Sequence, residues 1–180
     1  MRGKPMLRPA SGKEIEIIKN IIYGELQLRG VDLTSDLLVL DVPGGSHIDI
    51  FKPPPSVKRF LSLNLSVGLT PYSLGLYIGF IARRGVFVPS LPLAHELAPY
   101  CASGNLARCV YLPPGLEAKF LYGKKIILKD NISDGLVLVL NTLREALGWA
   151  VVESLNNKYG GQKRLLRPVR DLGWYLRRGG

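Results

Sequence analysis

From residue 108 onward, residues that favour turns divide the chain into short apolar runs, and this feature limits the possible folds more than any other. The runs are rich in Val, Ile and Leu and cover residues 108–112, 124–129, 136–141 and 147–154. Runs of this length with turn residues between them are typical of strands, because helices need longer periodic segments. A β-rich second half behind a mixed first half predicts two domains, residues 1–92 and residues 93–180.

The first half combines helical and strand patterns. Ser11 and Glu14 have the spacing of a capping box, and isoleucines follow at helical intervals, which predicts a helix over residues 12–24. Turn residues between apolar runs predict two hairpins, with strands at 37–42 and 47–51 and at 74–82 and 86–88. Shorter helical segments are predicted at 89–100 and 113–120.

Residues 60–82 form a stretch of 23 residues without a charged side chain, which is long enough to cross a bilayer. Pro71, Asn64 and three glycines interrupt it, so a buried helix, a turn and a strand explain it better than a membrane span. Residues 56–69 carry two signals. Their alternating apolar residues favour a strand, whereas the prolines before them are typical of a helix start.

The positive charge is concentrated at the end of the chain. The chain has 24 Lys and Arg residues against 14 Asp and Glu, a formal charge of +10. Residues 156–180 hold 7 basic side chains and 1 acidic one, whereas residues 93–155 hold 6 of each. A basic patch of this kind favours an anionic partner, with nucleic acid or a membrane surface the leading candidates.

Four cations within eight residues are the candidate RNA contacts: Lys163, Arg164, Arg167 and Arg170. Their long side chains suit phosphate oxygens, and the arginine fork adds bidentate contacts and stacking on bases. A continuous helix would place them on one face, but Pro168 would break it. A regular strand would divide them between two faces, and an edge strand kinked at Pro168 would present most of them together.

Several kinds of catalytic and metal chemistry have no support in the sequence. The two histidines, His47 and His95, fit surface or packing positions, and no phosphate-binding glycine motif is present. We therefore expect no catalytic residue, no cofactor and no metal. No apolar segment of signal-peptide length begins the chain, so we expect an intracellular protein in which Cys101 and Cys109 are reduced, buried thiols.

Six segments resemble a known family. The segments at 97–100, 110–123 and 148–154 are similar to a PUA domain, a small β-barrel-like RNA-binding module. The Phe-Leu-Tyr-Gly and Leu-Gly-Trp-Ala steps within them resemble the Nip-seven family of ribosome-biogenesis factors. Residues 7–14, 73–80 and 171–177 are similar to that family's start, middle strand and final turn. The sequence departs from the family at Ala150, where glycine is usual, and in its longer and more basic tail.

The resemblance implies an α+β protein. Its first domain would be an α/β unit with an antiparallel sheet flanked by helices, including a helix at about 55–66. Its second domain would be a PUA domain, a small mixed β-barrel. The family's archaeal members bind uridine-rich single-stranded RNA through a basic C-terminal cluster, which Lys163, Arg164, Arg167 and Arg170 match.

The function implied by the resemblance is non-catalytic work in large-subunit assembly and pre-rRNA processing. The first domain would dock other ribosome-assembly proteins, and no membrane would take part. The setting would be the cytoplasm of a prokaryote, which the archaeal-type sequence favours, or the nucleolus of a eukaryote. Two alternatives stay open: an RNA-modifying enzyme with an appended PUA domain, and a basic ribosome-associated scaffold protein. Arg83 and Arg84 would contact RNA or protein.

Overall fold

The chain folds into two compact units. The structure is a computed structural model and describes residues 5–57, 74–128, 132–156, 162–174 and 177. The first unit comprises Met1–Ile22 and Gly30–Leu93, and the second comprises Tyr23–Arg29 and Ala94–Gly180. No pattern in the sequence indicates that Tyr23–Arg29 belongs with the second unit. Backbone pairing explains it, because Arg29 N donates to Asn105 O over 2.8 Å and Leu28 pairs with Leu106.

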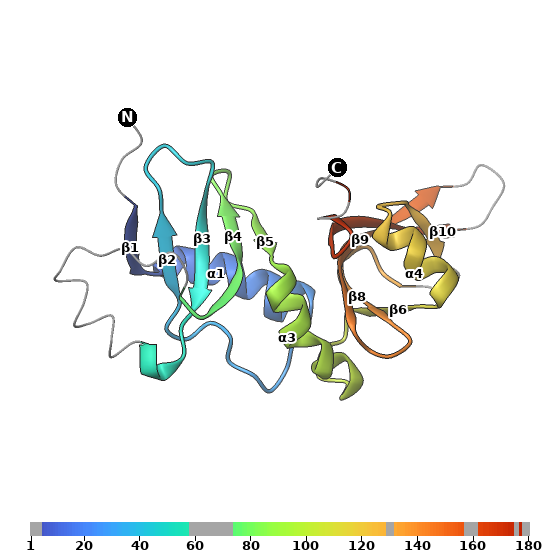
Figure 1. The fold of residues 1–180 in the computed structure, drawn as a ribbon, viewed down its shortest axis with the longest axis horizontal. Coiled ribbons are helices and arrows are strands. Elements are labelled where there is room, and N and C mark those ends of the chain that lie inside the picture. Colours follow the sequence, from blue (N-terminus) through green and yellow to red (C-terminus); the bar gives the residue numbers. More distant parts are fainter. Residues whose placement is uncertain (1–4, 58–73, 129–131, 157–161, 175–176, 178–180) are drawn as a thin grey trace. The chain divides into compact units, whose positions relative to one another are not determined.

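The first unit is built around an antiparallel sheet in which each strand pairs with the next along the chain (Figure 1). Its strands are β1 (Met6–Pro9), β2 (Leu38–Asp41), β3 (His47–Lys52), β4 (Leu76–Ala82) and β5 (Phe87–Pro89). Both predicted hairpins are therefore confirmed, as β2–β3 and β4–β5. A bulge in the β3–β4 pairing between Ile50 and Phe51 shifts the register by one residue.

One face of this sheet carries the predicted first helix, α1 (Gly12–Lys19), which continues as the π-helical segment η1 (Asn20–Glu25). Both hydrogen bonds of the predicted capping box are present, between Ser11 and Glu14. Arg8 on β1 adds a two-point ion pair to the Glu14 carboxylate, at 2.7 and 2.8 Å. This pair, with Ser11, lowers the pKa of Glu14 to about 2. The start of α1 is thus attached to the sheet.

The sheet face opposite α1 carries an apolar cluster. Phe51 and Leu74 are buried there, with Leu7, Leu38, Leu40, Val57 and Tyr77 packed against them. The helix expected at about 55–66 has its first residues in the helical segment 55–57, and the rest of it lies outside the described residues. Most of the uncharged stretch 60–82 also lies outside them. Within the described part of the chain, no helix is long and apolar enough to span a membrane.

The second unit contains a five-stranded mixed sheet in the order β6-β8-β9-β10-β7. Its strands are β6 (Cys109–Leu112), β7 (Ile126–Leu128), β8 (Gly135–Asn141), β9 (Ala146–Asn156) and β10 (Gln162–Asp171). The β6–β8 pair is parallel and the other pairs are antiparallel. This curled sheet confirms the expected mixed β architecture. Helix α4 (Pro114–Leu121), the predicted helical turn, covers its inner face with the fully buried Phe120.

Gly148 on β9 lets β10 approach unusually closely. A Cβ atom at this position would lie 2.2 Å from the Arg170 carbonyl oxygen and 2.6 Å from Asp171 Cα, and Gly148 has a φ of +144°. Any other residue would clash with the backbone and would be strained in this conformation. Glycine is therefore required where β9 meets the end of β10.

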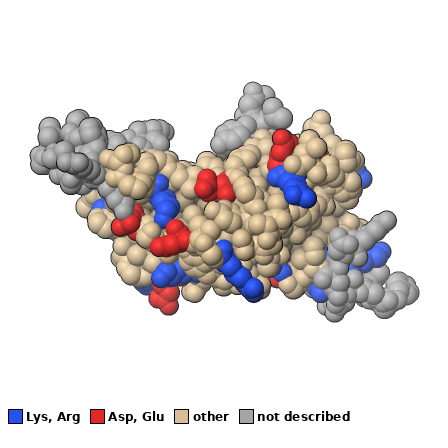
Figure 2. All heavy atoms as spheres, turned by 90° about the horizontal axis from the view of Figure 1, so that it is seen from below, with Lys and Arg blue, Asp and Glu red and all other residues tan. Residues whose placement is uncertain are grey.

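Charged side chains of both signs are interspersed on the molecular surface drawn in Figure 2. Several of the arginines are neutralised locally by ion pairs, which are Arg8–Glu14, Arg83–Asp41, Arg164–Asp134, Arg167–Glu153 and Arg177–Asp171. The formal charge therefore does not by itself locate a binding surface, and each cation has to be examined in its own surroundings.

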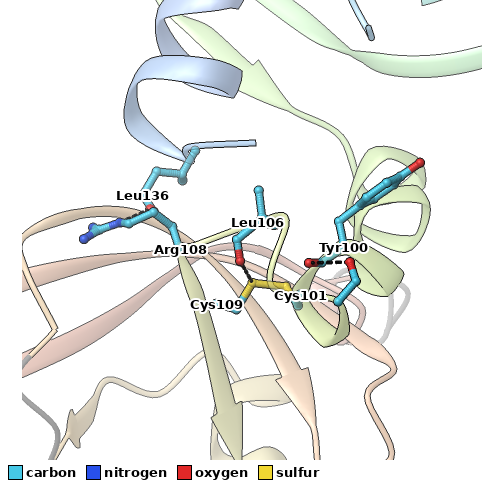
Figure 3. Close-up of a disulfide and its surroundings, with 7 residues drawn as sticks. Tyr100, Cys101, Leu106, Arg108, Cys109 and Leu136 are labelled. Carbon is cyan, nitrogen blue, oxygen red and sulfur yellow. Dashed lines mark hydrogen bonds between the residues drawn. A yellow bond between two sulfur atoms is a disulfide. The ribbon is translucent and has the colours of Figure 1, made fainter. Parts of the chain in front are cut away.

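The expectation of free thiols is wrong: Cys101 and Cys109 form a disulfide (Figure 3). Cys101 lies in the last turn of helix α3 (Leu91–Ala102), which is the predicted helix at 89–100, and Cys109 begins β6. The chain turns back between them through Gly104, with a φ of +74°, and Leu106 N donates to Tyr100 O over 2.9 Å. This turn brings the two Cα atoms to 6.0 Å, a normal spacing for a disulfide.

Reduction of this disulfide should destabilise the protein. The bond closes a loop over a sequence separation of 8, for which chain entropy gives about 2.5 kcal/mol. We expect a reductant to lower the melting temperature of the wild type to that of the Cys101→Ser/Cys109→Ser variant. The variant is the control, since the reductant should leave its own melting temperature unchanged. Two titratable thiols in unreduced, denatured protein would contradict the pairing.

Candidate nucleic-acid interface

All four predicted RNA contacts lie on β10, but not on one face of the sheet. Directly opposed residues of antiparallel strands share a face. Lys163, Arg167 and Arg170 oppose Leu155, Val151 and Trp149 of β9. These three partners are separated by even numbers of residues, so they and the three cations share one face. Arg164 opposes Ser154 and lies on the other face.

A bulge explains why Arg170 joins Arg167. A regular strand would place these residues, three apart, on opposite faces. Here Pro168 opposes Ala150 and Arg170 opposes the next residue, Trp149, so Val169 is the extra residue of a bulge. Strand β10 pairs with β7 only from Arg164 to Leu166, so Pro168 lies where β10 has one neighbour. Strand β10 is therefore irregular at a proline that has only one neighbouring strand. This is the kinked edge strand that the sequence analysis named as one alternative.

Arg164 belongs to a polar cluster that holds the sheet together. Its guanidinium pairs with Asp134 at 2.6 Å and donates to the Ser154 hydroxyl, which in turn donates to Asp134 at 2.7 Å. The side chain of Arg164 is only 14% exposed. Ser154, followed by Arg164, keeps the pKa of Asp134 below its ordinary value. This cluster joins β9 and β10 to the residue that precedes β8, so Arg164 is a structural cation.

The remaining cations form a surface, which we call the β10 face and define by Lys163, Arg167 and Arg170. Lys163 is exposed and takes part in no ion pair with the described residues. Arg167 pairs with Glu153 at 2.8 Å, with both side chains about two-fifths exposed. Exposed pairs of this kind contribute little, so a phosphate can displace Glu153. Arg170 lies opposite the buried Trp149. The β10 face is therefore exposed to solvent at Lys163 and becomes more buried towards Trp149.

Exposed aliphatic side chains accompany these cations. Ile127 opposes Leu165, which lies on the β10 face, and its side chain is 56% exposed. Leu155 opposes Lys163 and is 39% exposed. Phosphates can therefore meet Lys163 and Arg167 while bases or sugars contact apolar surface between them. Neither Ile127 nor Leu155 was predicted from the sequence, because strand pairing alone brings them beside β10.

Other basic and aromatic residues of the tail have different roles. Arg177 donates two hydrogen bonds of 2.9 Å to the buried Asp171 and a third to the Leu121 carbonyl. It fastens the chain end to α4 and is not the loosely held terminal cation that its position suggests. Trp174 is 38% exposed, and both Tyr159 and Arg178 lie outside the described residues.

A second buried cation was also missed from the sequence. Arg108 is 8% exposed and donates to the Leu136 carbonyl oxygen over 3.3 Å (Figure 3). It also donates to the Asp134 carbonyl oxygen over 3.0 Å and to the Ser133 hydroxyl. Arg108 directly precedes β6, so these bonds attach the residues before β8 to the start of its parallel partner β6. Among the described residues, no group of three or more His, Cys, Asp or Glu side chains is placed to hold a metal ion.

The two faces of β10 should respond differently to mutation. Arg164→Ala removes the ion pair with Asp134 and the hydrogen bond to Ser154, and we expect the melting temperature to fall by about 4 °C or more. Arg167→Ala removes an exposed pair and should change stability by less than about 0.5 kcal/mol. Thermal unfolding followed by circular dichroism measures both. Equal melting temperatures for the two variants would contradict the division of roles.

Comparison with known proteins agrees with this architecture. The profile of the UPF0113 PUA domain family matches residues 108–180. A UPF0113 protein from Aeropyrum pernix is 36% identical over 179 residues, spanning 97% of this chain and 93% of its own length.

Two solved structures share the fold. A conserved PUA domain protein from Thermoplasma acidophilum has a TM-score of 0.53 at 16% identity and covers 97% of this chain and 99% of its own. A hypothetical protein from Pyrococcus horikoshii has a TM-score of 0.52 at 13% identity, with coverages of 95% and 99%. The chain belongs to the UPF0113 family, and its residues 108–180 are a PUA domain, a module that generally binds RNA.

Proposed function

We propose that this protein is a non-catalytic RNA-binding factor of ribosome biogenesis, acting in large-subunit assembly and pre-rRNA processing. The observation that carries the RNA-binding part is the bulge in β10, which gathers Lys163, Arg167 and Arg170 on one face. The PUA family match supports RNA as the anion. The resemblance of the sequence to the Nip-seven family supports the place in ribosome assembly and membership of that family.

The β10 face suits single-stranded RNA. Its cations are spaced along one strand with aliphatic surface between them, and unpaired bases are free to contact that surface. We propose a preference for uridine-rich RNA, on the resemblance to archaeal members of the family. The first unit would dock other assembly proteins. A relative from an archaeon supports a prokaryotic cell, in which this work would take place in the cytoplasm.

Salt dependence of RNA binding tests the surface directly. If three phosphates of a single strand are contacted, log K should fall with log salt at a slope of about −2.1, since each contributes about −0.7. We expect poly-U to bind more tightly than poly-A or duplex RNA. In the variant Lys163→Ala/Arg167→Ala/Arg170→Ala, the slope should become shallower and poly-U affinity should fall.

The matched control removes three exposed charges elsewhere, as Lys13→Ala/Lys19→Ala/Lys119→Ala. It should retain the uridine preference and most of the affinity, because it changes the net charge by the same amount without touching β10. Equal losses in the two triple variants would show that the net charge, and not the β10 face, binds RNA.

Co-sedimentation tests the role in assembly. A biogenesis factor should travel with precursors of the large subunit and be absent from mature subunits, and the triple β10 variant should leave the precursor fractions. Retention on mature subunits would favour a resident scaffold protein instead. Chemical conversion of labelled tRNA or rRNA by the pure protein would contradict a non-catalytic role.

A further inference from the structure

The first unit contains a pocket that the proposed RNA surface does not use. The pocket has a volume of about 410 Å³ and is lined by Val42, Gly44, Gly45, Ser46, His47 and Asp49. It is formed by the β2–β3 turn and the start of β3. Asp49 opposes Phe80, whereas the preceding residue, Ile48, opposes Ile81 and faces α1. The pocket thus lies on the sheet face opposite α1, and its volume is in the usual range for small-ligand sites.

Its polar side chains are linked to one another. The Ser46 hydroxyl lies 3.0 Å from His47 Nδ1, and His47 Nε2 lies 3.5 Å from Asp49 Oδ1. The Tyr77 hydroxyl donates to the same Asp49 oxygen over 2.8 Å. Asp49 is 27% exposed, and its Oδ2 atom has no donor among the described residues. A carboxylate is therefore held in place with unused acceptor positions.

An aromatic surface lies beside this carboxylate. The His47 ring is 4.9 Å from the Phe80 ring, at an interplanar angle of 53°. The side chain of His47 is 43% exposed. A planar ligand can therefore stack on the exposed imidazole while its edge meets Asp49.

The turn that forms the pocket wall is fixed before any ligand arrives. Arg83 Nε donates to Gly45 O over 2.9 Å, and its Nη2 donates to Asp41 over 2.9 Å. Gly45 is packed so closely that a Cβ atom would lie 2.9 Å from Val42 O. Because little ordering remains to be done on binding, even a weak set of contacts can hold a ligand. Arg83, left open between RNA and protein by the sequence, supports this wall.

We propose that this pocket binds an unpaired guanine base. Of the four RNA bases, guanine alone presents two adjacent N–H donors, N1–H and N2–H, that can meet a carboxylate together. Adenine and cytosine place an acceptor beside their amino group, and uracil flanks its single N–H with two carbonyl oxygens. A guanidinium group also offers two parallel donors, but the formal charge of +10 disfavours a cation and favours a phosphate-bearing ligand.

Titration of the ¹⁵N-labelled full-length protein with GMP, AMP, CMP and UMP tests the site by NMR. We expect GMP to shift the amides of Gly45, Ser46, His47 and Asp49, with a dissociation constant at least about tenfold below those of the other three, since they lose a charge-assisted hydrogen bond. Asp49→Asn should weaken GMP binding at least about tenfold, and Glu96→Gln, an exposed position on α3, should leave it unchanged. His47→Ala should weaken all four nucleotides alike.

Two further arms locate the ligand and separate this site from the β10 face. In the triple β10 variant, a uridine oligonucleotide with one central guanosine should bind more tightly than GMP if RNA carries the base, and equal affinities would identify the free nucleotide; both support the site. The triple β10 variant should keep the GMP shifts, and Asp49→Asn should keep salt-dependent poly-U binding. Equal shifts with all four nucleotides, no shifts at 45–49, or the same shifts with N-acetylarginine amide in place of GMP would overturn the proposal.

Discussion

The pairing of β9 with β10 decides how the second unit presents its charge. Four cations on one regular strand would alternate between the core and the surface, and two of them would be lost to binding. The bulge after Pro168 changes this alternation, and Gly148 allows the bulged backbone to approach β9. Because of this one extra residue, Val169, three of the four cations share the β10 face and only Arg164 lies on the other face.

Five basic residues of the second unit fall into two physical classes. Arg108, Arg164 and Arg177 donate to carbonyl oxygens, hydroxyls or carboxylates, and each joins segments far apart in the sequence. The side chains of Lys163 and Arg167 are exposed, and Glu153, the carboxylate that pairs with Arg167, is itself about two-fifths exposed. The first class stabilises the unit and the second is available to a phosphate. Composition alone cannot distinguish them, because both classes contribute equally to the formal charge.

The same division holds in the first unit. Arg83 is occupied by the Asp41 carboxylate and the carbonyl of Gly45, and it keeps the β2–β3 turn in the shape that creates a pocket. Neighbouring Arg84 forms no ion pair within the described part of the chain. The β2–β3 turn, which the sequence suggests is a simple connection, is thus held in place by Arg83 and forms one side of the pocket. His47 and Asp49 form a candidate site only because Phe80 and Tyr77 of the adjacent strand contact them.

Local signals were enough to predict most elements. The capping box at Ser11 and Glu14, both hairpins and the short strands of the second half appear where the sequence places them, because caps, turns and alternation depend on residues a few positions apart. The resemblance of six segments to a PUA-containing family also predicted the class of fold. The disulfide escaped prediction, because two cysteines separated by eight positions pair only if the intervening turn brings them together.

The sequence by itself determined both hairpins of the first half, the short strands between residues 108 and 154, the first helix, the PUA class and the concentration of positive charge in the last 25 residues, whereas β1 was not predicted and β10 stayed open between helix and strand. Only the tertiary structure decided which of those charges reach the surface, that Tyr23–Arg29 joins the second unit, and that His47, Asp49 and Tyr77 meet. The physical reason is distance along the chain. Strand register, bulges and ion pairs join residues tens of positions apart, and a short-range pattern carries no record of such partners.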